Sequence, residues 1–312
     1  MVEKPHFLQS DIWKEFQNQL GNKIITGSGN GWSYTGMVKN DQIGPYIYIP
    51  YGPFAVSITT LKHAISDLKN QAMDIGAYVI YVEPMPPVTK EEARALFKHK
   101  GVHRQAHRTI RIDLSGSEDE IIAKMNPTRR NEYRNYDKKG FILAKDNSKQ
   151  SMDEFYRLLT LSSGKKGFYI REKSFFDKMF DTLVQSGNAS IFAARKEGKT
   201  EVAILVYDDD DTRYYAQVGR DLSADTSWAN APLISYAIID AKRAGKKHFD
   251  LYGISESDDK IDEKSGFTKF KKTFGGEVIQ FAGAWEIPIS KPKYFVKKTL
   301  QTAKKLAKKL RK

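Results

Sequence analysis

The sequence has no cysteine among its 312 residues. Disulfides, thiolate nucleophiles and cysteine-ligated metal ions are therefore excluded, and a cytoplasmic location is the default expectation. The polar residues 1–6 are followed by no apolar run, and nowhere do 18 uncharged apolar residues follow one another. We therefore predict neither an export signal nor a membrane-spanning helix.

Common catalytic signatures are missing as well. The sequence contains neither G-x-S-x-G nor the phosphate-binding G-x-x-x-x-G-K-[ST]. His99, His103 and His107 are spaced as on one helix face, but no carboxylate or cysteine accompanies them, so we favour a solvated or RNA-facing basic surface over a metal site. The aspartates at 208–211 lack the alternating ligands of a calcium loop and are expected at a solvated hairpin tip.

Acidic residues are absent from residues 291–312, which contain nine lysines and one arginine. This tail carries +10 of the net charge of +13, which leaves +3 for the other 290 residues. Because the body of the protein is only mildly basic, the overall charge does not support nucleic-acid binding.

The length predicts two domains, because one domain usually has roughly 100 to 200 residues. In the second half, β-rich segments separated by turn residues predict an antiparallel meander, followed by a helix with apolar residues at helical spacing. The elements expected there are three strands, a helix and a further strand, at residues 189–195, 201–207, 213–218, 229–244 and 247–252.

The first half repeats part of this plan. A strand at 46–50, a helix at 60–75 that ends at Gly76, and a strand at 77–83 have the same order as their counterparts in the second half. We infer two copies of one α/β unit. Between them we expect a serine-capped helix after Ser115. The second copy is expected to begin near Ser148, with its first helices at 152–162 and 173–186.

Aromatic and lysine side chains alternate in residues 267–276, which end in two glycines. Lysine beside aromatic rings can bind an anionic or carbonyl group in a partly dry site, where a positive charge acts more strongly. The alternative is a short basic helix that buries Phe267, Phe270 and Phe274. Arg213 and Tyr215 alternate with Tyr214 along a strand, so they share a face that is either core or cleft.

The order of these segments resembles the FemABX family of aminoacyl-tRNA-dependent peptidyltransferases, which add amino acids to the stem peptide of peptidoglycan precursors. The most specific motifs are D-L-x-G-I at 250–254 and, after it, F-K-x-x-F-G at 270–275. The likeness runs from about Gln9 to Pro288. Because residues 173–187 leave no room for a helical-hairpin insertion, the chain looks like the compact form of the family.

The resemblance implies an α/β (α+β) fold with two tandem domains of the GCN5-related N-acyltransferase (GNAT) type, in agreement with the internal repeat. In that family the last strand and the C-terminal helix return to the first unit. We therefore predict a first domain of residues 1–147 plus 286–312, and a second domain of residues 148–285 that carries the active-site segment.

The resemblance also assigns site residues. It places Lys271 at the reacting ester, with Phe270 positioning it, and Asp250 is the candidate acceptor for the proton of the attacking amine. In the meander we expect Arg213 to bind phosphates or carboxylates of the acceptor and Tyr215 to flank it. The remaining substrate-binding candidates are Gln217, at a position where family members often have tyrosine, together with Tyr252 and Lys269.

The partners implied are aminoacyl-tRNA, as co-substrate without a bound cofactor, and a lipid-linked or UDP-linked muropeptide precursor; a monomer is the default. One alternative is an acyl-CoA-dependent acyltransferase of the GNAT type, although residues 217–221 do not complete the pyrophosphate loop Q-x-x-G-x-G/A. The other is a non-catalytic module that binds RNA or a membrane surface.

The tail predicts a basic amphipathic helix whose stripe contains Val296, Leu300, Ala303, Ala307 and Leu310. Such a helix suits an anionic membrane surface, which would place the protein at the inner face of the cell membrane. It could equally pack its stripe on the first domain and offer lysines to tRNA phosphates. The candidate surface lysines are Lys304, Lys305, Lys308 and Lys309.

Overall fold

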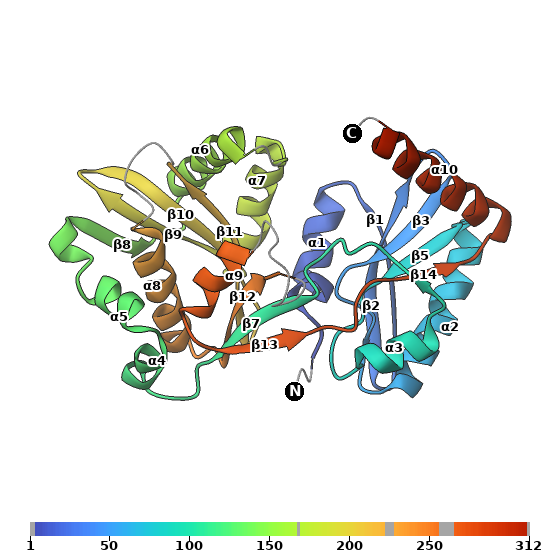
Figure 1. Ribbon diagram of the computed structural model, residues 1–312, viewed down its shortest axis with the longest axis horizontal. Coiled ribbons are helices and arrows are strands. Elements are labelled where there is room, and N and C mark those ends of the chain that lie inside the picture. Colours follow the sequence, from blue (N-terminus) through green and yellow to red (C-terminus); the bar gives the residue numbers. More distant parts are fainter. Residues whose placement is uncertain (1–3, 167–168, 222–227, 256–264, 311–312) are drawn as a thin grey trace. The chain divides into compact units, whose positions relative to one another are not determined.

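The computed structural model describes residues 4–166, 169–221, 228–255 and 265–310. The chain divides into two compact units. Unit 1 consists of Met1–His107 and Phe281–Lys312, and unit 2 consists of Arg108–Gln280. Each unit has its own mixed sheet with helices packed on it (Figure 1).

The sheet of unit 1 contains one parallel pair, β3 and β5, which is joined through helix α2 (Ile58–Ile75). This helix begins with a reciprocal capping box between Ser57 and Thr60, and it ends at Gly76, whose φ of +71° favours glycine. In spatial order the strands are β1 (Lys23–Gly29), β2 (Trp32–Asn40), β3 (Pro45–Ile49), β5 (Val79–Val82), β14 (Trp285–Pro288) and β6 (His99–Lys100), and β4 (Phe54–Ala55) pairs with β2.

Helices cover both faces of this sheet. The apolar side of α2 packs on one face, where Leu61 and Leu68 meet Ile47 and Ile80. The opposite face presents tyrosines, and α10 (Lys291–Leu310) reaches them through Tyr294. The other helices of unit 1 are η1 (Phe7–Gln9), α1 (Asp11–Gln19) and α3 (Lys90–Leu96).

The sheet of unit 2 also has one parallel pair, β11 and β12, which is joined through α8 (Asn230–Arg243). In spatial order its strands are β13 (Glu277–Gln280), β7 (Arg108–Asp113), β12 (His248–Gly253), β11 (Thr212–Arg220), β10 (Lys199–Asp208), β9 (Ala189–Lys196) and β8 (Phe141–Lys145). The other helices are α4 (Glu118–Lys124), α5 (Pro127–Arg134), η2 (Asp137–Lys139), α6 (Lys149–Lys166), α7 (Lys173–Met179), the π-helix η3 (Phe180–Val184) and α9 (Ser265–Lys272).

The buried side of α8 forms the main core of unit 2 together with β9, β10 and β12. Helix α6 packs on β10 and β11. It approaches β11 so closely that a Cβ atom at Gly219 would lie 2.6 Å from the backbone nitrogen of Leu159. Glycine at this position therefore permits the contact between helix and sheet.

The two units repeat one plan: three antiparallel strands, a helix and a strand parallel to the third. The sequence predicted all five elements in unit 2 but only the last three in unit 1. Beside the second parallel strand, each unit has an antiparallel strand from a distant part of the chain. Strand β14 pairs with β5 in unit 1, and β7 pairs with β12 in unit 2.

The strands β7 and β14 place the boundaries of unit 2 at other residues than the sequence predicted. Unit 2 begins at Arg108 and not at the predicted residue 148, because residues 108–113 and 141–145 form β7 and β8 of its sheet. It ends at Gln280, a few residues before the predicted end at 285. The last strand and helix lie in unit 1.

Candidate functional site

A pocket in unit 2 lies where the parallel strands β11 and β12 separate. These strands pair at only three positions, from Thr212 to Tyr214 on β11. Just beyond them, the register between β10 and β11 shifts and leaves Ala216 as a bulge, which bends the strand. The pocket has a volume of about 760 Å³, a size typical of ligand sites. Its lining includes Leu159, Tyr169, Ile170, Arg171, Phe176, Tyr215, Ala216, Gln217, Val218, Tyr252, Gly253, Phe267 and Lys271.

The end of β12 is held in an unusual conformation beside this pocket. Tyr252 has a φ of +61°, which is costly for a residue other than glycine, on the order of 1–3 kcal/mol. Asp250 compensates for this strain, because its Oδ1 accepts hydrogen bonds from the Tyr252 N–H, at 2.7 Å, and from the hydroxyl of Thr109. The carboxylate thereby fixes the direction of the carbonyl groups that follow it.

Lys271 extends from α9 to these carbonyl groups. Its side chain is 2% exposed, and its Nζ donates to the carbonyl oxygens of Gly253, at 2.9 Å, and Tyr252, at 3.3 Å. The same Nζ lies 4.0 Å from the centre of the Phe267 ring, a cation–π distance. The pocket wall therefore contains a positive charge in a largely dry environment, where it acts strongly on a nearby carbonyl oxygen.

Two further polar atoms of the pocket wall, the hydroxyl of Tyr215 and Oε1 of Gln217, are buried. Neither has a hydrogen-bond partner among the described residues. Burial raises the pKa of Tyr215 well above its usual value, so the phenol is protonated at neutral pH and can donate or accept. Both atoms can therefore bond to a ligand.

The structure brings together only part of the predicted site. Lys271, Tyr215, Gln217 and Tyr252 all line the pocket, whereas Phe270 and Lys269 do not. Phe270 packs on the core of unit 2, with its ring edge-on to Phe274 and under the guanidinium of Arg129, and Lys269 is exposed. The aromatic neighbour of the lysine is instead Phe267, one helical turn earlier.

The prediction for Asp250 also needs correction. Its carboxylate is buried, does not line the pocket, and bonds to Thr109 and Tyr252, with Arg111 at 3.6 Å. Burial raises its pKa, against the lowering effect of Arg111 and these hydrogen bonds. The register between β12 and β7 shifts between Asp250 and Gly253, which makes a bulge in β12. Asp250 supports this bulge and is not placed to take a proton from an attacking amine.

Arg213, predicted to bind the acceptor, lies in the core of unit 2 and does not line the pocket. Its side chain is 1% exposed and forms ion pairs with Asp208, at 2.8 Å, and Asp240, at 2.6 Å. These bonds tie β11 to β10 and α8. Asp208 is therefore buried, so the expectation of a solvated tip was wrong for the first of the four aspartates.

The sequence prediction missed Phe267 as a pocket residue, and also Tyr169 and Arg171. The helical spacing of four between Phe267 and Lys271 could have revealed the first. Tyr169 and Arg171 lie between α6 and α7, where no periodic pattern marks them. Arg171 adds a second cation to the wall of the pocket.

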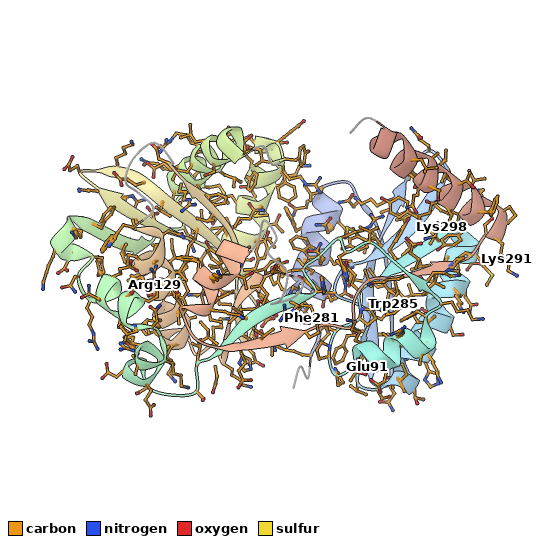
Figure 2. All side chains as sticks on the ribbon, in the orientation of Figure 1. Glu91, Arg129, Phe281, Trp285, Lys291 and Lys298 are labelled. Atoms are coloured by element: carbon orange, nitrogen blue, oxygen red, sulfur yellow. The ribbon has the colours of Figure 1, made fainter. Side chains whose placement is uncertain are left out.

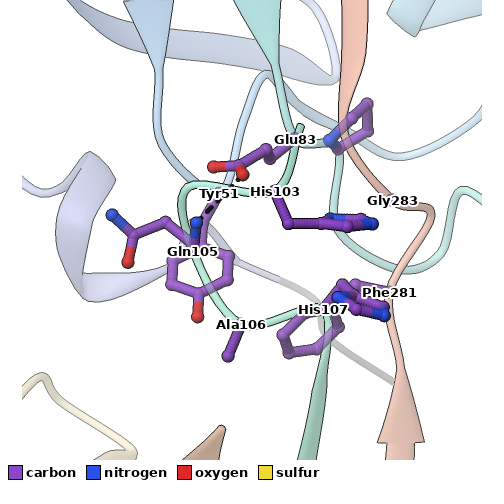
Figure 3. Close-up of a pocket in the computed structure, with 9 residues that line it drawn as sticks. Tyr51, Glu83, His103, Gln105, Ala106, His107, Phe281 and Gly283 are labelled. Atoms are coloured by element: carbon purple, nitrogen blue, oxygen red, sulfur yellow. Dashed lines mark hydrogen bonds between the residues drawn. The ribbon is translucent and has the colours of Figure 1, made fainter. Parts of the chain in front are cut away.

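Unit 1 contains a much smaller pocket, of about 10 Å³, beside the buried carboxylate of Glu83 (Figure 3). Glu83 accepts hydrogen bonds from the backbone N–H groups of Arg104 and Gln105, at 2.9 and 3.0 Å, and from the hydroxyl of Tyr48, at 2.7 Å. The space suffices for no more than a water molecule, so these bonds identify Glu83 as a structural carboxylate.

The three histidines do not share a helix. His99 lies in β6 beside Tyr294, and the rings of His103 and His107 stack 3.7 Å apart beside the pocket shown in Figure 3. Within the described ranges, no group of three or more His, Cys, Asp or Glu residues is arranged to hold a metal ion.

The basic tail is helical as predicted and forms α10. The side chains of the candidate lysines Lys304, Lys305, Lys308 and Lys309 lie outside the described residues. Across residues 4–310, apart from the undescribed segments, no helix combines the length and apolar character needed to cross a bilayer.

Comparison with known sequences points to the part of unit 2 that contains Lys271. The FemAB family model matches residues 185–302, a stretch that contains β11, β12 and Lys271. Over 72% of its length, the chain is 25% identical to a protein of Staphylococcus epidermidis named lipid II:glycine glycyltransferase, and 23% identical to one of the same name from Staphylococcus aureus. It spans about half of each relative, 54% and 55% respectively.

Solved structures share the fold across both units. The crystal structure of FemX matches with a TM-score of 0.81 at 17% identity, and covers 93% of this chain and 94% of its own. A tandem GNAT protein from the clavulanic acid biosynthesis pathway matches with a TM-score of 0.54 at 9% identity, and covers 91% and 90%. The chain therefore consists of two GNAT-like domains, and its resemblance to the FemABX family is confirmed.

Proposed function

We propose that the chain is an aminoacyltransferase that moves an amino acid from aminoacyl-tRNA to an amine of the peptidoglycan stem peptide, as in the synthesis of interpeptide bridges. The observation that carries this proposal is the buried ammonium of Lys271 in the wall of the pocket in unit 2. Lys271 and the pocket residues of β11 and β12 also belong to the segment that matches the FemAB family. No bound cofactor is required, because the tRNA ester is itself the activated substrate.

The pocket suits the chemistry of ester aminolysis. The amine nitrogen bonds to the ester carbon, the bond from that carbon to the ribose oxygen breaks, and the amine proton passes to the released ribose oxygen, which becomes a hydroxyl. Negative charge builds on the carbonyl oxygen before the ester bond breaks. The ammonium of Lys271 and the hydroxyl of Tyr215 would stabilise this charge, and Phe267 would limit the access of water.

The wall also offers contacts for the rest of the substrates. The guanidinium of Arg171 suits a phosphate of the tRNA acceptor end, and Oε1 of Gln217 can accept a hydrogen bond from an amino group. We propose a lipid-linked precursor as the acceptor, since the relatives are named for lipid II. A monomer, with peripheral contact between the basic tail and an anionic membrane at its inner face, completes the proposal.

The direct test is transfer from radiolabelled aminoacyl-tRNA to a lipid-linked or UDP-linked precursor. The variant Lys271→Ala should lose about 10²- to 10³-fold in rate, as is typical when one oxyanion donor is removed. The matched control is Lys272→Ala, which removes an exposed neighbouring lysine and should leave the rate unchanged. Equal rates for wild type and Lys271→Ala would remove Lys271 from this role.

A separate measurement addresses the donor. Charged tRNA should protect the chain against thermal unfolding, and acyl-CoA should not. Protection by acyl-CoA alone would replace the proposal with an acyl-CoA-dependent acyltransferase.

A further inference from the structure

Helix α10 packs on unit 1 with a polar side inward and its apolar side outward. Lys297, at 5% exposure, and Tyr294 are buried against the sheet. Phe295, by contrast, is 73% exposed, and Leu306 is 57% exposed. This is the reverse of an ordinary surface helix, which buries its apolar stripe. The exposed apolar side chains that are described, here called the outer stripe, are Phe295, Val296, Leu300, Ala303 and Leu306.

A buried ionic cluster sets this orientation. Glu286 on β14 forms ion pairs with Lys297, at 2.7 Å, and Lys298, at 2.9 Å, and accepts a hydrogen bond from the hydroxyl of Tyr294, at 2.7 Å. The ammonium of Lys297 also lies 4.5 Å from the centre of the Tyr81 ring. Turning the helix over would leave the carboxylate of Glu286 buried without these cations, which is strongly unfavourable. The outer stripe is therefore fixed toward the solvent.

Positive charge borders the outer stripe. Lys291 and Lys298, both labelled in Figure 2, lie on the first half of α10, and Lys293 is exposed near its start. Lys69 and Lys98 line the same 730 Å³ pocket as Lys291, Lys298 and Phe295. No acidic residue occurs from 291 to the end of the chain.

We propose that the outer stripe of α10 inserts into the interfacial region of an anionic lipid bilayer. An apolar face bordered by lysines matches a surface that has negative headgroups above an acyl layer. A second copy of the chain fits less well, because pairing two outer stripes would bring two tails of charge +10 together. RNA would leave the apolar side chains exposed. This binding does not depend on the transfer reaction.

The test is co-sedimentation of the full chain with vesicles of phosphatidylcholine alone or mixed with phosphatidylglycerol. The variant Phe295→Gln, Leu300→Gln and Leu306→Gln keeps every charge. It should bind anionic vesicles at least about tenfold more weakly than wild type, because three apolar side chains no longer leave water. The matched control replaces three exposed apolar residues elsewhere in unit 1, Val56→Gln, Met73→Gln and Val102→Gln, and should bind as wild type does.

A second measurement reports insertion itself. The fluorescence of Phe295→Trp should shift to the blue on anionic vesicles and be quenched by brominated lipid tails, whereas Met73→Trp should show neither change. Unchanged binding by the triple variant would overturn the proposal. So would self-association of the wild type that the triple variant abolishes in sedimentation velocity, since the outer stripe would then join two copies.

Discussion

The ammonium nitrogen of Lys271 lies 2.9 Å from the carbonyl oxygen of Gly253, so the end of β12 sets the position of the cation. This carbonyl follows a left-handed residue, Tyr252, whose N–H donates a hydrogen bond to Asp250. A buried carboxylate that does not line the pocket thus helps to position Lys271 through the main chain.

We expect Asp250→Asn to keep transfer within a few-fold of wild type, because the amide oxygen can still accept from Tyr252 N–H and Thr109. Asp250→Ala should lower the rate strongly, since the bulge of β12 loses its support and Lys271 is displaced. Steady-state rates across pH provide the measurement. A general base would behave differently: Asp250→Asn would then be as inactive as Asp250→Ala.

Replacement of Arg213 should affect stability first. Arg213→Met leaves Asp208 buried without its cation, which should lower the free energy of unfolding by about 3–5 kcal/mol. Arg243→Met, at an exposed ion pair with Glu118, should cost less than about 1 kcal/mol. Urea unfolding measures both. A stable Arg213→Met whose only defect is a raised KM for the acceptor would restore the original prediction for this residue.

The Glu286 cluster predicts a pH dependence. Burial alone would raise the pKa of Glu286, but the ammonium groups of Lys297 and Lys298 and the Tyr294 hydroxyl lower it below its usual value. The cluster therefore stabilises the fold above the pKa of an unfolded glutamate, and this contribution is lost as the pH falls through the lower folded value.

Glu286→Gln should accordingly be less stable than wild type at pH 7, and the difference should shrink in acid. The exposed Glu277→Gln should show no comparable loss. Urea unfolding from pH 7 down to about pH 3 follows this trend. A Glu286→Gln variant as stable as wild type at neutral pH would contradict the assigned role of the cluster.

Gly219 offers a test of the contact between α6 and β11. Gly219→Ala places a methyl group against the backbone of Leu158 and Leu159. Overpacking of this kind should lower the free energy of unfolding by about 1–3 kcal/mol. Leu159 lines the pocket, so activity should fall as well. The control is Gly164→Ala in α6, where an added Cβ atom would have no neighbour within 4 Å. This variant should be neutral or slightly stabilising. Thermal unfolding distinguishes the two variants.

Local patterns in the sequence predicted much of the fold. The meander, the helix after it and the strand ending near Tyr252 all occur close to their predicted positions, because their apolar spacing and turn residues are contained within short windows. The hairpin of β1 and β2 was missed, since its first strand is rich in glycine, serine and threonine. The domain boundary was misplaced because β7 pairs with β12, more than a hundred residues later.

The site was harder to predict than the fold. Alternation along β11 placed Arg213 and Tyr215 on one face, but it could not show that Arg213 meets Asp208 in the core while Tyr215 reaches the pocket. Phe270 and Phe267 lie on different sides of one helical turn, and only the packing of α9 distinguishes them. Side-chain direction is decided by these tertiary contacts.

The exchange of β7 and β14 has a consequence for how the chain matures. During synthesis, β5 emerges long before β14, so the hydrogen-bonding edge of β5 that β14 occupies stays open until all of unit 2 has been synthesised. In unit 2 the corresponding strand, β7, is synthesised before its partner β12, so β12 can pair with it as soon as it emerges. The sheet of unit 2 is complete with β13, which still precedes β14, so unit 1 is completed last although it begins the chain. A cut at residue 107 or 108 would separate β5 from β14, so the sheet of unit 1 cannot be completed without residues that follow unit 2.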